Sequence, residues 1–185
     1  MTIRLAAPLQ SDSVVDGEGI RTVIWTQGCA HACPFCHNPL THDFKGGFEE
    51  DLDTLKKQID SLEGQTGITF SGGDPLYQID AVLELAKYIN KNRKDLNIWC
   101  YSGFTYEEIL KMPKGKELLS NIDILVDGLF EIDKRSLDLP FRGSSNQRII
   151  QAKKSVASNK IILNEELMKP KDISPLYKKD DKIYI

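Results

Sequence analysis

A short apolar segment leads directly into three closely spaced cysteines in the sequence Thr22-Val23-Ile24-Trp25-Thr26-Gln27-Gly28-Cys29-Ala30-His31-Ala32-Cys33-Pro34-Phe35-Cys36. Residues 22–26 are apolar and β-branched, which predicts a short buried strand. Pro34 follows the second cysteine and disfavours helical dihedrals at Cys33, so the three thiols are predicted to lie on a loop. Loops at the carboxyl ends of strands are where α/β folds carry their reactive groups.

A pattern of strand, loop and helix repeats after this stretch. Apolar residues recur at helical spacing from Leu52 to Leu62, and Glu49, Glu50 and Asp51 are expected at the front of that helix. The alternation predicts parallel βαβ units. The other expected strands are residues 67–70, 97–101 and 122–126. The other expected helices are residues 79–92 and 106–112. Residues 3–9 are expected to form an edge strand or a cover.

The last third of the chain is less regular. Residues 131–145 are expected to form a long polar loop, and residues 148–152 and 160–163 are expected to form further strands. We expect an α/β fold, a partial (βα) barrel of mostly parallel strands with about five to six βα units, because a closed eight-stranded barrel needs ~250 residues. Residues 1–185 are expected to form a single domain, with a core of about residues 5–165 and a tail over residues 166–185.

Composition argues against several classes of function. The net charge of −3 does not favour binding to nucleic acid or to an anionic membrane. No run approaches the ~20 apolar residues of a membrane span, and residues 1–5 lack the apolar core of a signal peptide, so we expect a cytoplasmic protein. Four cysteines, three of them crowded together, indicate metal binding or catalysis rather than a disulfide framework. Cys100 lies in an apolar run and is expected in the core.

The three crowded thiols have three possible uses. Iron-sulfur cubanes normally take four cysteine thiolates, so a set of three leaves one iron open for chemistry. A zinc site formed by the three cysteines with His31 or His37 is the second use, although zinc sites usually carry a second, distant cysteine pair. A group of redox-active thiols is the third. The absence of a second pair favours the iron-sulfur cluster.

The segment Ser71-Gly72-Gly73-Asp74 follows an expected strand and precedes a helix. Paired glycines let backbone groups approach a ligand because no Cβ stands in the way. An ordinary turn before a helix N-cap is the commoner explanation for such a motif in isolation. Ser102, at the end of another expected strand, equally fits a ligand contact or a helix cap.

The spacing Cys29-x3-Cys33-x2-Cys36, with an aromatic residue before the last cysteine, resembles the signature loop of the radical S-adenosylmethionine (SAM) enzymes. The resemblance implies a partial barrel of radical SAM type in which Cys29, Cys33 and Cys36 bind one [4Fe-4S] cluster and SAM chelates the open iron. It also implies that the Gly-Gly motif binds the SAM amino group, with Asp74 where many members have Glu. The SAM contacts implied by the resemblance are Phe35, Cys36, His37, Gly72, Gly73, Asp74 and Ser102.

A narrower resemblance rests on motifs that occur together and in order. Over roughly residues 5–152 the chain is similar to the activating proteins of anaerobic (class III) ribonucleotide reductases, with Glu18 and Phe35 replacing the Pro and Gly often seen there. The shared motifs include Asp16-Gly17-Glu18-Gly19-Ile20-Arg21, Cys36-His37-Asn38-Pro39, Ser71-Gly72-Gly73-Asp74-Pro75-Leu76, Tyr101-Ser102-Gly103-Phe104-Thr105 and Arg142-Gly143-Ser144-Ser145-Asn146-Gln147-Arg148.

This resemblance implies a radical SAM oxidoreductase that cleaves SAM reductively and uses the 5'-deoxyadenosyl radical to generate a glycyl radical on the large reductase subunit. No catalytic side chain is expected beyond the cluster and SAM, and a flavodoxin-type or similar protein is implied as electron donor. Residues 127–148 are expected to dock the partner, to close the site or to form a solvated loop.

Two alternatives stay open. One is another radical SAM enzyme, either the activase of a different glycyl-radical enzyme or a protein similar to 7-carboxy-7-deazaguanine synthase. The other is a non-enzymatic zinc-binding module.

Overall fold

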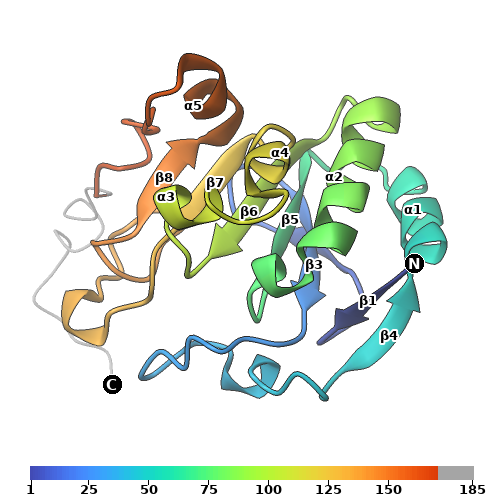
Figure 1. Ribbon diagram of the computed structural model, residues 1–185, viewed down its shortest axis with the longest axis horizontal. Coiled ribbons are helices and arrows are strands. Elements are labelled where there is room, and N and C mark those ends of the chain that lie inside the picture. Colours follow the sequence, from blue (N-terminus) through green and yellow to red (C-terminus); the bar gives the residue numbers. More distant parts are fainter. Residues whose placement is uncertain (171–185) are drawn as a thin grey trace, which may run out of the picture.

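The computed structural model describes residues 1–170. One mixed β-sheet of eight strands forms its centre, in the order β4-β1-β3-β5-β6-β7-β8, with β2 paired to β3 beside this path (Figure 1). The predicted α/β class is therefore confirmed. The strands are β1 (Thr2–Leu5), β2 (Gln10–Ser13), β3 (Arg21–Thr26), β4 (Phe48–Asp51), β5 (Gly67–Gly72), β6 (Asn97–Ser102), β7 (Ile124–Asp127) and β8 (Arg148–Gln151).

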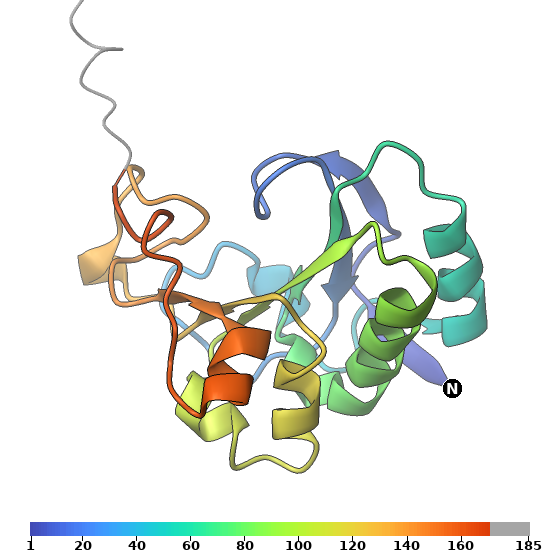
Figure 2. The same cartoon turned by 90° about the horizontal axis from the view of Figure 1, so that it is seen from above.

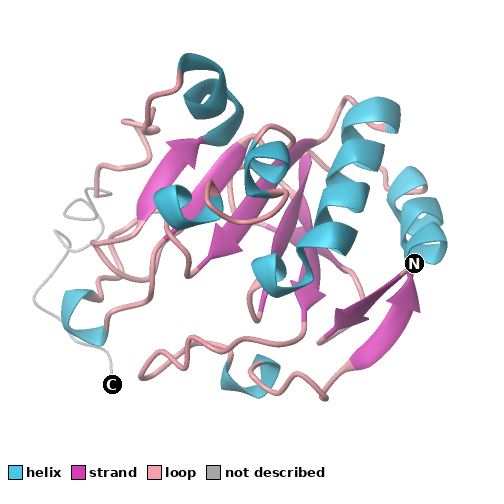
Figure 3. Cartoon of the chain, in the orientation of Figure 1, coloured by secondary structure: helices cyan, strands magenta, loops and turns pink. Residues whose placement is uncertain are grey.

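The parallel strands β3, β5, β6 and β7 form the middle of the sheet (Figure 3). All of them were predicted from runs of apolar and β-branched residues. Ile24 pairs with Phe70, and Phe70 with Cys100, so buried side chains form rows across the strands. Because parallel strands end at the same edge of a sheet, the loops that follow β3, β5 and β6 lie near one another.

Helices gather on one face of this sheet (Figure 2). The longest helix of residues 1–170, α2 (Ile79–Asn92), buries Val82, Leu85 and Ile89 along one stripe, as helical spacing requires. None of the helices in these residues is long and apolar enough to cross a membrane. The remaining helices are α1 (Leu52–Asp60), α3 (Tyr106–Ile109), α4 (Gly115–Leu119) and α5 (Ala152–Ser158), with 3-10 turns η1 (Pro39–Thr41), η2 (Pro75–Gln78) and η3 (Ile132–Lys134).

A smaller apolar cluster covers part of the opposite face. Trp99, Val126 and Ile149 are buried there, and Leu167 and Met168 pack against them. The described beginning of the expected tail, residues 166–170, is thus attached to the sheet, whereas residues 171–185 lie outside the described part. The assignment of residues 1–185 to one domain stays a prediction.

The acidic segment before α1 corrects one prediction. Glu49 and Glu50 do not begin a helix but lie in β4, which pairs antiparallel with β1, so that Arg4 faces Glu49. The Arg4 guanidinium donates to the Glu49 carboxylate at 2.9 Å, and this cross-strand pair offsets the low strand propensity of glutamate. β1 is consequently an inner strand rather than the predicted edge, and α1 begins after Asp51, whose side chain caps it.

The carboxyl-terminal third departs further from the prediction. β8 was expected, but it runs antiparallel to β7, and the expected strand at 160–163 is reduced to one bridge between Ile150 and Leu163. α4 and α5 were not predicted, because their short sequences show no apolar periodicity, and α3 ends at Ile109 rather than at residue 112. The observed architecture is an α/β fold with one mixed β-sheet whose central strands are parallel.

Candidate cofactor site

The loop that follows β3 carries the three thiols. Residues 27–38 have no regular secondary structure, as predicted, and end in η1. The backbone turns sharply at Ala32 and Phe35, whose φ angles are 49° and 59°. Such left-handed dihedrals cost about 1 kcal/mol outside glycine. The Cys36 N–H donates to the Cys33 carbonyl at 3.1 Å and closes the second turn.

All four cysteines of the chain lie in the described part and are free thiols. Cys29, Cys33 and Cys36 are partly exposed on the loop, whereas Cys100 is buried in the core, as predicted. Burial raises the pKa of the Cys29 thiol. The Asn38 N–H donates to Cys36 Sγ at 3.4 Å, a kind of contact that tunes iron-sulfur clusters. Three unpaired thiols on one irregular loop fit an iron-sulfur cluster as a donor set.

The two nearby histidines do not complete a zinc site. His31 Nε2 lies 2.7 Å from Oδ2 of Asp74, and the His37 ring packs against Phe130 with centroids 4.9 Å apart. Within residues 1–170, no group of three or more His, Cys, Asp and Glu side chains is arranged to hold a metal ion. The three loop thiols are not arranged as such a group either. The zinc interpretation, however, also lacks its fourth ligand.

The Gly72-Gly73 pair allows a close approach, but to the chain's own backbone. A Cβ on Gly72 would lie 2.4 Å from the carbonyl oxygen of Thr26, and one on Gly73 would lie 2.4 Å from that of Gly28. The N–H groups of Gly73 and Asp74 donate to these same carbonyls at 2.8 and 3.0 Å. The end of β5 is thereby fastened to the beginning of the cysteine loop.

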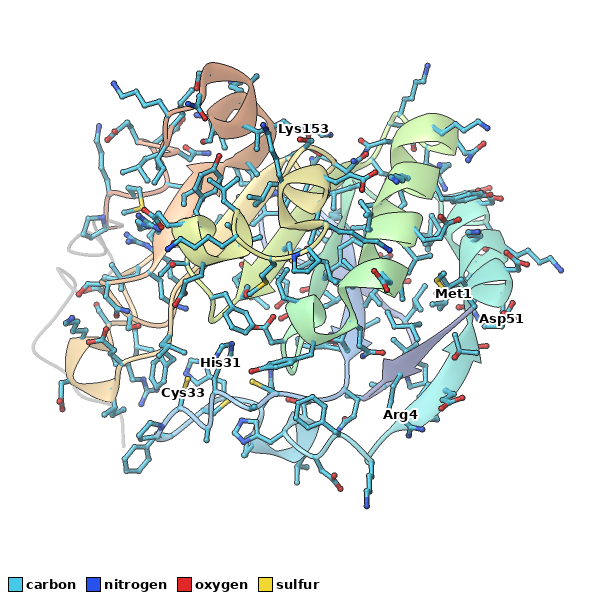
Figure 4. The ribbon with its side chains drawn as sticks, viewed as in Figure 1. Met1, Arg4, His31, Cys33, Asp51 and Lys153 are labelled. Carbon is cyan, nitrogen blue, oxygen red and sulfur yellow. The ribbon has the colours of Figure 1, made fainter. Side chains whose placement is uncertain are left out.

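Asp74 is buried where the loops after β3, β5 and β6 meet. Its carboxylate caps η2 by accepting from the Leu76 N–H at 2.9 Å. Ser102 Oγ donates to it at 2.9 Å, the Gly103 N–H donates at 2.9 Å, and His31 contributes the bond at 2.7 Å. Figure 4 places His31 and Cys33 on the loop below the carboxyl ends of the parallel strands.

The place where the loops after β3, β5 and β6 meet at Asp74 is called the junction below. A cavity of about 540 Å³ opens beside it. Trp25, Ser71 and Tyr101 line it from the strands, and His37 lines it from the cysteine loop. Arg142, which is buried, lines it from the segment before β8. Part of the expected polar loop, residues 131–145, therefore packs over this cavity.

Two donor atoms at this cavity have no hydrogen-bond partner among residues 1–170. The Arg142 guanidinium donates to the carbonyls of Gln147 and Met168 at 2.9 and 2.7 Å, but its Nε has no partner among residues 1–170. The buried Tyr101 hydroxyl also has none there. Burial raises the pKa of Tyr101 and lowers the pKa of Arg142.

A family described as a 4Fe-4S single cluster domain matches residues 15–150. The chain is 34% identical over 142 residues to the anaerobic ribonucleoside-triphosphate reductase-activating protein of Pasteurella multocida (strain Pm70), which covers 74% of this chain and 90% of that protein. A protein of the same name from Enterobacteria phage T4 is 31% identical over 139 residues, covering 73% and 86%. The protein of that name from Escherichia coli (strain K12) is 32% identical over 141 residues, covering 72% and 90%.

The chain belongs to the family of anaerobic ribonucleoside-triphosphate reductase-activating proteins. The resemblance seen in the sequence is thereby confirmed. The matched residues of this reductase-activating family member contain all three loop cysteines.

The structure brings some predicted site residues of this family member together and leaves others apart. Gly72, Gly73, Asp74 and Ser102 share the junction with the cysteine loop. Phe35, by contrast, is 78% exposed. The hydrogen bond between His31 and Asp74 was not predicted from the sequence.

A further network at the same edge was also missed. Arg148 binds the carboxylate of Asp127 and, at 2.7 Å, that of Glu107, and it thereby ties β8 to β7 and α3. Its pKa is raised by these carboxylates. The motif containing Arg148 was noted in the sequence, but its partners lie too far along the chain to be found from local patterns.

Proposed function

We propose that this chain is the radical SAM oxidoreductase that activates an anaerobic ribonucleoside-triphosphate reductase. The observation that carries the proposal is the set of three free thiols, Cys29, Cys33 and Cys36, on one loop at the carboxyl end of a parallel strand within the match to a 4Fe-4S cluster domain. When bound, the cluster and SAM together supply a 5'-deoxyadenosyl radical, which generates the glycyl radical on the large reductase subunit.

The chain's own residues explain why three ligands are used rather than four. His31 is bonded to Asp74, His37 packs on Phe130, and Cys100 is in the core. The three loop thiols would hold a [4Fe-4S] cluster and leave one iron for SAM. This donor set supports the radical SAM enzyme over the zinc module.

The SAM site follows from the position of the junction. We place SAM beside the cysteine loop and the ends of β5 and β6, where the parallel strands form the wall of a partial barrel of radical SAM type. The neighbouring cavity of about 540 Å³ provides room for a ligand. The residues proposed to contact SAM or to shape its site are Phe35, Cys36, His37, Gly72, Gly73, Asp74 and Ser102.

The rim of this cavity suits a protein partner. Val14, Val15 and Leu137 are 64%, 73% and 88% exposed around it. Exposed apolar residues around a pocket mark interaction sites. We assign this rim to the glycine-bearing segment of the large reductase subunit, and residues 127–148 to docking it or closing the site. A flavodoxin-type electron donor, a cytoplasmic location and no role for nucleic acid or membrane complete the proposal.

The decisive experiment mixes the anaerobically reconstituted, reduced protein with SAM and the large reductase subunit. We expect iron and sulfide in the protein, methionine as a product, and a glycyl-radical signal by electron paramagnetic resonance. Methionine without that signal would reject this partner. A colourless protein with one zinc and no sulfide would reject the enzyme.

A further inference from the structure

The buried carboxylate of Asp74 is saturated with donors. Its two oxygens offer about four lone-pair sites, and four groups of the chain donate to them, because Ser102 Oγ reaches Oδ1 at 3.1 Å as well as Oδ2 at 2.9 Å. No site remains for an ammonium group. The donors are the N–H of Leu76, the hydroxyl of Ser102, the N–H of Gly103 and Nε2 of His31.

We propose that Asp74 is a positioning residue, whose carboxylate holds the cysteine loop to the ends of β5 and β6 through His31 instead of binding the SAM amino group. The inference rests on the proposed function and deepens it, because the loop that Asp74 holds carries the thiols. Asp74 and Ser102 then belong to the SAM site by shaping it.

His31 alone among the four donors comes from the cysteine loop. The other three belong to η2 and to the end of β6, which are parts of the framework. His31 lies between Cys29 and Cys33 in the chain, so its bond fixes the segment that joins two thiols. Because a carboxylate only accepts, Nε2 carries the proton in this bond.

The surroundings of His31 are built for its ring. Phe104 packs edge-on against it with centroids 4.4 Å apart, and Tyr77 lies at 5.7 Å. Gly103 leaves the space that the ring occupies, since a Cβ there would lie 2.6 Å from Cδ2 of His31. The His31 ring is therefore held by its hydrogen bond to Asp74 and by two aromatic neighbours, in a space that exists because residue 103 is glycine.

The first test compares His31→Leu with His31→Gln, whose amide nitrogen can replace Nε2 as donor. His42→Leu is the control, because His42 stands at the end of the same loop segment and makes no side-chain hydrogen bond within residues 1–170. In the full chain without cluster, we expect amide hydrogen exchange of Gly28, Cys29 and Gly103, whose N–H groups are hydrogen-bonded, to accelerate about tenfold to a hundredfold in His31→Leu, the value of a bond to a charged group. His31→Gln and His42→Leu should match the wild type.

The second test uses the reconstituted protein and follows methionine release. We expect His31→Leu to raise KM for SAM about tenfold or more, with kcat changed less. His31→Gln should restore KM. Gly103→Ala keeps both members of the bond but displaces the ring, and it should reproduce the effect of His31→Leu.

A double-mutant cycle separates positioning from direct SAM binding. If Asp74 acts through His31, Asp74→Asn should add less than about threefold to KM in the His31→Leu background. If Asp74→Asn raises KM as much in the His31→Leu background as in the wild type, the carboxylate binds SAM directly and the inference is wrong. If Asp74→Asn does not fold, Gly103→Ala decides in its place.

Unchanged exchange in both His31→Leu and Gly103→Ala would likewise overturn the inference. If the wild-type protein binds no iron and sulfide and releases no methionine, the proposed function is refuted, but the inference about Asp74 is not. The exchange comparison would still decide whether Asp74 holds the loop.

Discussion

Two buried charges stand at opposite ends of the parallel strands. Arg21, at the amino end of β3, donates to Thr69, Asn97 and the carbonyl of Ile68 and lies over the Trp99 ring at 5.3 Å. Burial lowers the pKa of Arg21 to about 10, and no carboxylate in the described part bonds to it. Asp74, beyond the end of β5, accepts hydrogen bonds from Leu76, Ser102, Gly103 and His31.

The partners of the two charges differ in origin. Those of Arg21 belong to the sheet and to the turn before β3, so this charge joins parts of the framework. One partner of Asp74 comes from the cysteine loop. We expect the amino end of the strands to contribute stability and the carboxyl end to form the proposed site, so mutations at the two ends should separate these properties.

The largest effect is expected at the carboxyl end. Cys33→Ala removes one of three proposed cluster ligands, so methionine release from SAM should fall to background while the melting temperature of the cluster-free chain stays within about 2 °C, since Cys33 is only partly buried. Cys100→Ala is the control, and it should keep SAM cleavage while losing about 1 kcal/mol of stability in urea unfolding. Retained cleavage in Cys33→Ala would refute its assignment as a ligand.

Arg21→Met tests the amino end. The change leaves buried acceptors without a donor, so we expect the free energy of unfolding in urea to fall by about 3 kcal/mol or more. KM for SAM should stay the same in the folded fraction. Arg4→Met, which removes a partly exposed arginine that pairs with Glu49 at 2.9 Å, should cost less than about 1 kcal/mol. Equal losses in the two variants would contradict the distinction.

Gly72→Ala affects both properties together. It places a Cβ 2.4 Å from the Thr26 carbonyl at φ 109°, which should cost about 2 kcal/mol or more and also lower SAM cleavage by detaching β5 from the loop. Gly64→Ala is a matched control, because Gly64 also has a positive φ but open space, and it should cost about 1 kcal/mol with normal cleavage. Thermal unfolding and methionine release check both.

The smallest effect is expected for Tyr101→Phe. The Tyr101 hydroxyl is buried without a partner in the described part, so its removal should leave stability unchanged or raise it by about 1 kcal/mol. Urea unfolding of the cluster-free chain measures this. A loss above about 1 kcal/mol would mean that the hydroxyl has a partner in the folded protein.

The sequence predicted the parallel centre of the sheet because Ile24, Phe70 and their neighbours are buried on strands whose local pattern is clear. It failed at β4, where cross-strand pairing with Arg4 overrides the low propensity of Glu49. It failed again at α5, which has no apolar periodicity. The cysteine spacing identified the proposed ligands, but the bond between His31 and Asp74 joins residues 43 positions apart and depends on the fold.

The acidic strand β4 has a consequence for how a partner can approach. It forms one margin of the sheet with exposed carboxylates, which discourage strand addition by another chain. At the other margin, residues 162–164 already bond to the backbone of β8. β-augmentation is therefore disfavoured at these two margins, which favours the approach of a polypeptide to the loops at the carboxyl ends of the strands.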